Sequence, residues 1–185
     1  MKSIFYNTMS YELQTQKEAV GYDQSTAEKY TAGQEQFFGV EKVEDGATLA
    51  MEAEIAKIRD REERPIETLC DFGCGSNREY LRKWLGASGA SSVIGVEPSD
   101  HMRALSDKTK NDAEPIVVVE GDWKKTGLPD ASADMVVSRF SLHHLRKISE
   151  GYTELARILK PGGHAVISLP HPDYCREELK KKNEE

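Results

Sequence analysis

The sequence has little cysteine and no long apolar segment. Its three cysteines, Cys70, Cys74 and Cys175, include no Cys-x-x-Cys pair. This argues against a disulfide framework or a zinc site and favours a reducing compartment, so we predict a cytoplasmic protein without a metal. No window approaches the ~18 consecutive apolar residues of a membrane span. The N-terminal residues hold an early lysine but no apolar core, which argues against a signal peptide.

Basic charge is also scarce. Lys and Arg total 25 against 32 Asp and Glu, which gives a formal net charge of −7. An acidic surface does not attract nucleic-acid phosphates or anionic lipid in general, so we expect neither a nucleic acid nor a membrane as partner. The length of 185 residues fits one domain with a substantial core.

The chain divides into three predicted parts. Residues 1–46 are polar with scattered aromatic residues, and they form either an arm anchored to the main body or a lid over a ligand site. Residues 47–175 form the main domain, which opens with a helix over 47–61, and residues 176–185 form a charged tail.

From residue 66 onward, short apolar segments alternate with amphipathic ones. We predict strands at 66–71, 91–97, 115–122, 133–140 and 164–170. Between them we predict helices at 77–86, ended by Gly86, at 99–110, capped by Ser99 or Asp100, and at 148–160, ended by "PGG". Apolar strands alternating with helices are typical of a doubly wound α/β domain with a mainly parallel sheet.

Ligands bind such sheets beyond the carboxyl ends of the strands, and candidate residues stand at those points. Asp71, Gly73 and Gly75 follow the first strand, and Glu97 ends the second, where its carboxylate can accept hydrogen bonds from ribose hydroxyls. Gly121, Asp122 and Trp123 follow the third strand and can meet an adenine.

The glycine turn differs from a dinucleotide site. No third Gly follows Gly75 at the spacing of G-x-G-x-x-G, and Asp71 precedes the turn. A carboxylate there suits an ammonium group better than a pyrophosphate. The predicted ligand is therefore a nucleoside with an amino-acid tail, and an NAD-binding dehydrogenase is disfavoured.

Five segments in register with the predicted strands resemble one family. "LCDFGCGSN", "VIGVEPSDHM", "VVVEGDW", "LPDASADMVVSRFSLHHL" and "LARILKPGGHAVISL" look like a class I S-adenosylmethionine-dependent methyltransferase, of the branch that holds many small-molecule and quinone-type enzymes. The similarity covers roughly residues 66 to 170 and implies a Rossmann-like methyltransferase fold.

The resemblance implies a set of site residues and S-adenosylmethionine as cofactor. Asp71, Gly73, Cys74 and Gly75 would line its methionine end, Glu97 would bind the ribose, and Pro98, Met102, Gly121, Asp122 and Trp123 would surround the adenine. Arg139 and Ser141 would lie beside the sulfonium. His143 or His144 would face a small-molecule acceptor, with His171 as a further candidate base.

Two features depart from the family. Asn77, Arg78 and Glu79 stand where a further small residue is usual, and we expect Asn to tolerate unusual backbone angles there. The family's C-terminal strand hairpin is not found after the fifth strand, so the fold is expected to be C-terminally truncated. The fifth strand would then lie at an edge that the charged "REELKKKNEE" tail, a second copy or a partner could cover. A catalytically inactive, cofactor-binding partner subunit is the alternative to an active methyltransferase.

Overall fold

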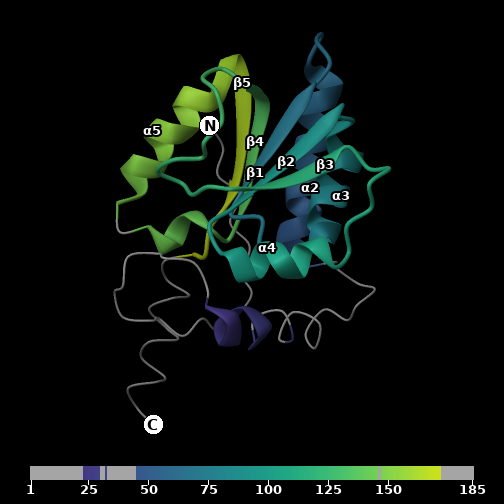
Figure 1. The fold of residues 1–185 in the computed structure, drawn as a ribbon. Helices are drawn as coiled ribbons and strands as arrows, with labels where there is room; N and C mark the ends of the chain where they lie inside the picture. The colour runs from purple at the N-terminus through teal and green to yellow at the C-terminus, as the bar shows by residue number, and fades with distance from the viewer. Residues whose placement is uncertain (1–22, 30–31, 33–44, 146, 172–185) are drawn as a thin grey trace.

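A computed structural model describes residues 23–29, 32, 45–145 and 147–171. Its core is a five-stranded sheet in the order β3-β2-β1-β4-β5, and every pair of neighbouring strands is parallel (Figure 1). The strands are β1 (Thr68–Phe72), β2 (Ser92–Glu97), β3 (Ile116–Glu120), β4 (Ala133–Arg139) and β5 (Leu159–Ser168). The predicted doubly wound α/β fold is confirmed.

Helices cover both faces of this sheet. Helices α2 (Gly46–Arg61) and α3 (Arg78–Ser88) pack on one face, where their buried residues share a cluster with Leu69 of β1. Helix α5 (Ile148–Ile158) packs on the other face with Cys70 and Phe72 (Figure 1). Because side chains alternate along a strand, successive β1 residues serve opposite layers. Helix α4 (Asp100–Asp107) follows β2, and a 3-10 turn (η1, Leu142–His144) follows β4.

The strand order reverses beside β1. The chain runs from β1 outward through β2 to β3, and it then returns to the other side of β1 with β4 and β5. The carboxyl ends of β1 and β4 therefore diverge into loops that lead to opposite faces, which is the usual place for a ligand in this architecture. The fold thus directs attention to residues 71–76 and 139–144.

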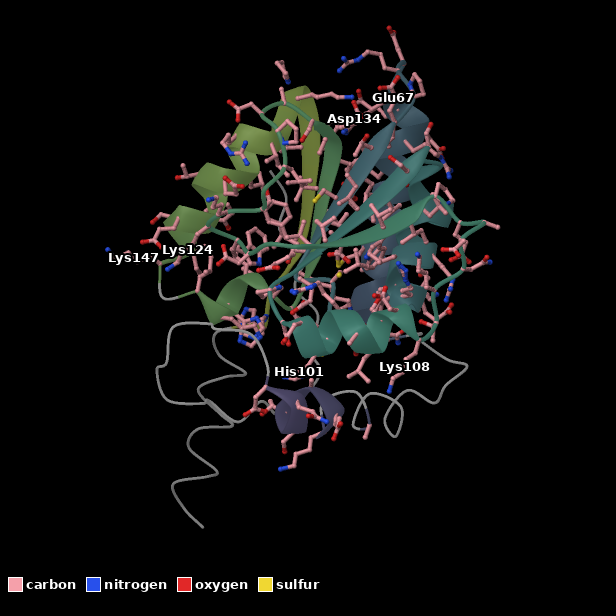
Figure 2. The ribbon with its side chains drawn as sticks, viewed as in Figure 1. Glu67, His101, Lys108, Lys124, Asp134 and Lys147 are labelled. Carbon is pink, nitrogen blue, oxygen red and sulfur yellow. The ribbon has the colours of Figure 1, made fainter. Side chains whose placement is uncertain are left out.

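The two ends of the sheet carry different side chains. Figure 2 shows Glu67 and Asp134 together at the end where β1 and β4 begin, and His101 of α4 at the opposite end. Asp134 Oδ2 accepts from the backbone nitrogens of Glu67 (3.0 Å) and Thr68 (2.9 Å), and Lys160 forms ion pairs with Asp134 and Glu67. This paired cluster stabilises the starts of the strands, at the end away from the candidate site.

Several predicted boundaries differ from the observed ones by one to five residues, and two of the differences have a clear physical cause. Helix α3 continues through Gly86 to Ser88 and ends at Gly89, which has φ +64° and donates its backbone N–H to Leu85 O at 2.9 Å. Gly89, and not Gly86, is thus the left-handed C-terminal glycine. Strand β5 begins at Leu159 rather than at residue 164, because Leu159 already pairs with Ala133 before a register shift that accommodates the "PGG" segment.

Several predictions fall outside the described residues. The charged tail (176–185), the proposed covering of the β5 edge and most of the 1–46 arm belong to this category. Within the arm, residues 24–29 are helical and lie at the same end of the molecule as α4 (Figure 1). No helix among the described residues is both long and apolar enough to cross a membrane.

Candidate functional site

The turn after β1 is tied to the end of β2. The backbone nitrogens of Gly73 and Cys74 donate to Val96 O at 2.7 and 3.2 Å. Gly73 and Gly75 have φ +71° and +67°, the left-handed region that favours glycine. Cys74 is buried, and its Sγ would lie only 2.6 Å from a Cβ added at Gly95. Burial raises the pKa of its thiol well above the ordinary value, so Cys74 is a packing residue of the turn and no thiolate nucleophile.

Asn77 preserves the turn by a different device from the expected one. Its φ of −96° lies in the ordinary extended region, and its side chain caps α3 by accepting from Glu79 N at 3.0 Å. Asn is among the best N-cap residues. The chain therefore needs no unusual backbone angle at this position.

Asp71 is a buried carboxylate with one oxygen unsatisfied. It lies near the end of β1, only 2% exposed, and its Oδ2 accepts from Trp84 Nε1 at 3.0 Å. Its Oδ1 has no hydrogen-bond partner among the described residues. Burial raises the pKa of Asp71 to about 7, opposed by the Trp84 hydrogen bond and by the charge of Arg139. Such an oxygen is an acceptor for a cationic group.

Glu97 ends the neighbouring strand β2 and joins it to the glycine turn. Its Oε2 accepts from Gly75 N and its Oε1 from Ser99 N, both at 3.0 Å. Burial raises the pKa of Glu97, while these two backbone hydrogen bonds lower it. Each carboxylate oxygen retains a free lone pair, so Glu97 can also accept from a pair of hydroxyls.

Ser99 and Arg103 hold the segment that follows Glu97. Ser99 Oγ caps α4 by accepting from Met102 N at 3.3 Å, and Arg103 Nη1 donates to the carbonyls of Glu97 and Pro98 at 2.8 and 2.9 Å. Met102 is buried. These hydrogen bonds hold Pro98 and Met102 in the segment directly after Glu97. The contact of either residue with adenine stays a prediction.

The loop after β3 is anchored to its own backbone and to α5. Asp122 Oδ1 accepts from Lys124 N (2.7 Å) and Lys125 N (2.9 Å), and Thr126 donates to Glu154 of α5. A Cβ at Gly121 would lie 2.5 Å from Thr126 O, so this close turn requires glycine. Asp122 is partly exposed and keeps an oxygen available for a ligand.

Trp123 packs inward from that loop. Its ring meets Phe72 edge-on at 4.6 Å between centroids, and its Nε1 donates to Ser141 Oγ at 2.8 Å. A Cβ at Gly73 would lie 1.8 Å from the same Ser141 Oγ. Trp123, Ser141 and Gly73 thus join the loops after β3, β4 and β1. The contact of Trp123 with adenine stays a prediction, whereas its role in holding these loops together is visible.

Arg139 is committed to a buried ion pair that the sequence did not indicate. It ends β4, pairs with Asp45, and lies 4.4 Å from the Tyr80 ring centroid. Asp45 also caps α2, because its Oδ1 accepts from Thr48 N at 2.8 Å. An Asp three residues before Thr48 at a helix start was a readable N-cap signal, but its pairing with a residue 94 positions away was not.

The two histidines after β4 differ in environment. Their rings lie 4.1 Å apart between centroids; His143 is half-buried and His144 exposed. Burial, aided by His144, lowers the pKa of His143 to about 3, so this imidazole is neutral at physiological pH. His171 is described but lies three residues beyond β5. Among the described residues no cluster of His, Cys, Asp and Glu is arranged to hold a metal ion.

Comparison with known proteins identifies the family. A family described as "Methyltransferase domain" matches residues 70–167, which is more than half of the chain and includes the carboxyl ends of β1, β2, β3 and β4. The chain belongs to the methyltransferase domain family. The family expected from the sequence is thereby confirmed, and S-adenosylmethionine is its cofactor.

The relatives of this chain are named for different acceptors, and the chain spans less than half the length of several of them. It is 27% identical over 165 residues to a dimethylglycine N-methyltransferase from Parasynechococcus marenigrum, a match that covers 82% of this chain and 57% of that protein. It is 29% identical over 141 residues to the mRNA cap guanine-N(7) methyltransferase of Saccharomyces cerevisiae, covering 66% of this chain and 31% of that protein.

A solved structure gives the same result for the fold. The crystal structure of an S-adenosylmethionine-dependent methyltransferase from Mesorhizobium loti has a TM-score of 0.54 and 29% identity, and the match covers 69% of this chain and 57% of that one.

The residues of this family member fit S-adenosylmethionine. Asp71 Oδ1 is a buried acceptor that lacks a partner in the described structure, and the cofactor's ammonium group is a matching donor. No described atom lies within 4 Å of a Cβ added at Gly75, which leaves space beside the turn. The Glu97 carboxylate adjoins the same turn through its hydrogen bond from Gly75 N.

Proposed function

We propose that this chain is an S-adenosylmethionine-dependent methyltransferase that acts on a small-molecule acceptor. One observation carries the proposal: the buried carboxylates of Asp71 and Glu97 end adjacent strands on either side of the Gly73–Gly75 turn. One carboxylate would accept from the ammonium group of the cofactor's amino-acid tail, and the other would accept from its ribose hydroxyls.

The chain's own residues position the reactants. S-adenosylmethionine supplies, when bound, an electrophilic methyl group on a sulfonium sulfur. Asp71 and Glu97 would hold the two ends of that cofactor, and the tightly packed Ser141–Gly73 contact would fix the wall between them. Holding a nucleophile close, aligned and desolvated is the main catalytic requirement for such a displacement.

His143, in the turn after β4, would accept a hydrogen bond from the methyl acceptor. Because its pKa is lowered to about 3, it is neutral near pH 7 but a weak base. This favours an acceptor whose nucleophilic atom already has a free lone pair at neutral pH. The net charge of −7 and the relation to a dimethylglycine N-methyltransferase support a small molecule over a polyanion.

The N-terminal helical residues support the predicted lid. Residues 24–29 lie at the end of the sheet where α4 and the candidate site are found (Figure 1). Asp23 caps them by accepting from Thr26 N at 2.8 Å, and Ala27 is fully buried. A segment in this position would exclude water from the reacting groups.

Glu97→Gln should weaken cofactor binding by roughly ten- to thirty-fold, equivalent to about 1.5–2 kcal/mol for a lost charge-assisted hydrogen bond. Glutamine keeps the size of the side chain, and its amide oxygen can still accept from Gly75 N, but its N–H₂ group then faces Ser99 N, so thermal unfolding of the variant must accompany the titration. Calorimetric titration with S-adenosylhomocysteine measures the change. Glu120→Gln, an exposed acid at the end of the next strand, is the control and should bind like the wild type. Absence of binding by the wild type would refute the proposed function.

The glycine turn offers a second test. Gly75→Ala meets no described atom within 4 Å, so it should cost only the strain of its positive φ, about 1 kcal/mol of stability, yet reduce cofactor binding more than ten-fold by filling the ligand space. Gly89→Ala is the control, because it imposes the same φ strain far from the site and should leave binding unchanged. Equal binding by both variants would contradict a ligand beside Gly75. Thermal unfolding and calorimetry together separate the two effects.

A non-catalytic partner subunit is the second candidate. Strand β5 lies at the edge of the sheet, and no described strand pairs with its outer side. An open edge is a template for another strand. Cofactor binding without methyl transfer to any acceptor in a labelled-methyl screen would favour this candidate.

A further inference from the structure

Trp84 is a core residue whose indole N–H donates to a site carboxylate, Asp71. It lies in the second turn of α3, fully buried, with Tyr80 stacked on it at 6.3 Å between ring centroids. An indole N–H is a donor only, and a buried one needs a partner. Many acceptors would satisfy it, such as a backbone carbonyl. In this chain it donates to Asp71 Oδ2 at 3.0 Å.

The contact joins a helix to the end of the strand that begins the site. Asp71 points to the α3 side of β1, between Gly95 of β2 and Val137 of β4 in register. The hydrogen bond from Trp84 to Oδ2 restrains the orientation of the carboxylate. Its Oδ1 is then the oxygen that remains, buried and without a partner among the described residues.

The charged groups around Asp71 do not fix it in the same way. Arg139 of β4 favours its ionised form through space, but the Arg139 guanidinium is engaged by Asp45. Glu97 of β2 disfavours the ionised form, and the neighbouring thiols of Cys70 and Cys74 have raised pKa values and stay neutral. Trp84 is therefore the direct hydrogen-bond donor to a carboxylate that burial drives towards protonation.

We propose that Trp84 is a positioning residue for cofactor binding: its indole N–H favours the ionised form of Asp71 and orients the carboxylate so that Oδ1 receives the ammonium group of S-adenosylmethionine. This inference rests on the proposed function and adds to it a residue outside the strand ends. Trp84 touches Asp71 and acts only through that carboxylate.

The test is Trp84→Phe, which removes the donor and keeps an aromatic ring. Titration with S-adenosylhomocysteine from pH 6 to 9 should show binding about ten-fold weaker than wild type at pH 7. The ratio of the two affinities should shrink as pH rises, because the variant's Asp71 ionises at a higher pH and its binding recovers. The amine of the ligand titrates equally in both experiments and cancels from the ratio.

Ile55→Val is the matched control. Ile55 is fully buried in the same cluster as Trp84 but donates no hydrogen bond. It should lower stability by about 0.5–1.5 kcal/mol and leave both the affinity and its pH dependence unchanged. If the ratio of the wild-type and Trp84→Phe affinities does not vary with pH, Trp84 is only a packing residue. That result would overturn the inference but leave the proposed function standing. Absence of binding by the wild type would overturn the proposed function and the inference with it.

A spectroscopic measurement on the wild type covers the case in which Trp84→Phe does not fold. The chain has two tryptophans, so its ¹H–¹⁵N spectrum contains two indole signals. The Trp84 signal should shift with a midpoint near pH 7 and lose that titration in Asp71→Asn. Added S-adenosylhomocysteine should move the midpoint downward, because its ammonium group favours ionised Asp71. A Trp84 signal that added S-adenosylhomocysteine leaves unchanged, in both position and midpoint, would overturn the inference.

Discussion

Asp71→Asn should abolish measurable cofactor binding and at the same time stabilise the ligand-free protein above pH 7. Asparagine keeps an oxygen that can accept from Trp84, but it presents an amide N–H₂ where the ammonium group would lie. Losing a buried, charge-assisted hydrogen bond and gaining a donor–donor clash should cost about 3 kcal/mol or more, a loss of at least about one hundred-fold. Calorimetric titration at pH 7.5 measures it.

The stability gain follows from the raised pKa of Asp71. The folded protein holds this proton up to about pH 7, whereas the unfolded chain releases it near its ordinary value of 3.8. Between these values the folded state binds more protons, so the stability of the wild type falls as pH rises and stays low above pH 7. The asparagine that replaces Asp71 does not titrate. The melting temperature of the variant should thus equal that of the wild type near pH 4 and exceed it by several degrees at pH 8. This difference corresponds to a gain of roughly 1–3 kcal/mol in the free energy of unfolding.

A control separates this effect from a general loss of charge. Asp60→Asn removes an exposed carboxylate at the end of α2, for which the same pH series should show no growing difference. If Asp71→Asn binds S-adenosylhomocysteine like the wild type, the ammonium group is held elsewhere. If it is less stable than the wild type at pH 8, the buried carboxylate is compensated by the protein.

The strand ends could be predicted because each is a local pattern. Apolar segments followed by Asp71, by Glu97 and by Gly121 place three loops at the carboxyl edge of a parallel sheet, and the strand order β3-β2-β1 makes these loops neighbours. The structure then adds contacts between positions far apart in sequence. The hydrogen bonds from Trp84 to Asp71 and from Trp123 to Ser141 are two examples. Each exists only if the right face of a helix or loop meets the right strand, to within one residue.

Errors in the predicted boundaries have the same origin. Gly86 looked like a helix end because glycine is common there, but its neighbours Trp84 and Ser88 are buried and hold the helix together for two more residues. Packing overrides a single weak helix former. Conversely, Asn77 was expected to serve through unusual backbone angles, and it serves as a cap instead.

Asp45→Ala should be the most destabilising change outside the cofactor site. The Asp45 and Arg139 side chains are only 4% and 9% exposed, so removing Asp45 leaves a guanidinium buried without its partner. Breaking a buried ion pair costs about 3–5 kcal/mol, and losing the N-cap of α2 costs about 1 kcal/mol more. Urea unfolding of the ligand-free protein measures the sum.

Two further variants separate these contributions. Asp45→Asn retains a good capping side chain that can accept from Thr48 N, and it removes only the charge, so it should recover about 1 kcal/mol. Arg139→Met combined with Asp45→Asn removes both charges and should be more stable than Asp45→Asn alone, because no unpaired ion then remains buried. Arg139→Met alone completes the cycle. If the losses of unfolding free energy in Asp45→Asn and Arg139→Met simply add up to the loss in the double variant, the ion pair does not stabilise the fold. A coupling energy would mean that Asp45, at the start of α2, holds Arg139 at the end of β4 in place. The Asp45 carboxylate would then connect α2 to the loop after β4 that borders the candidate site.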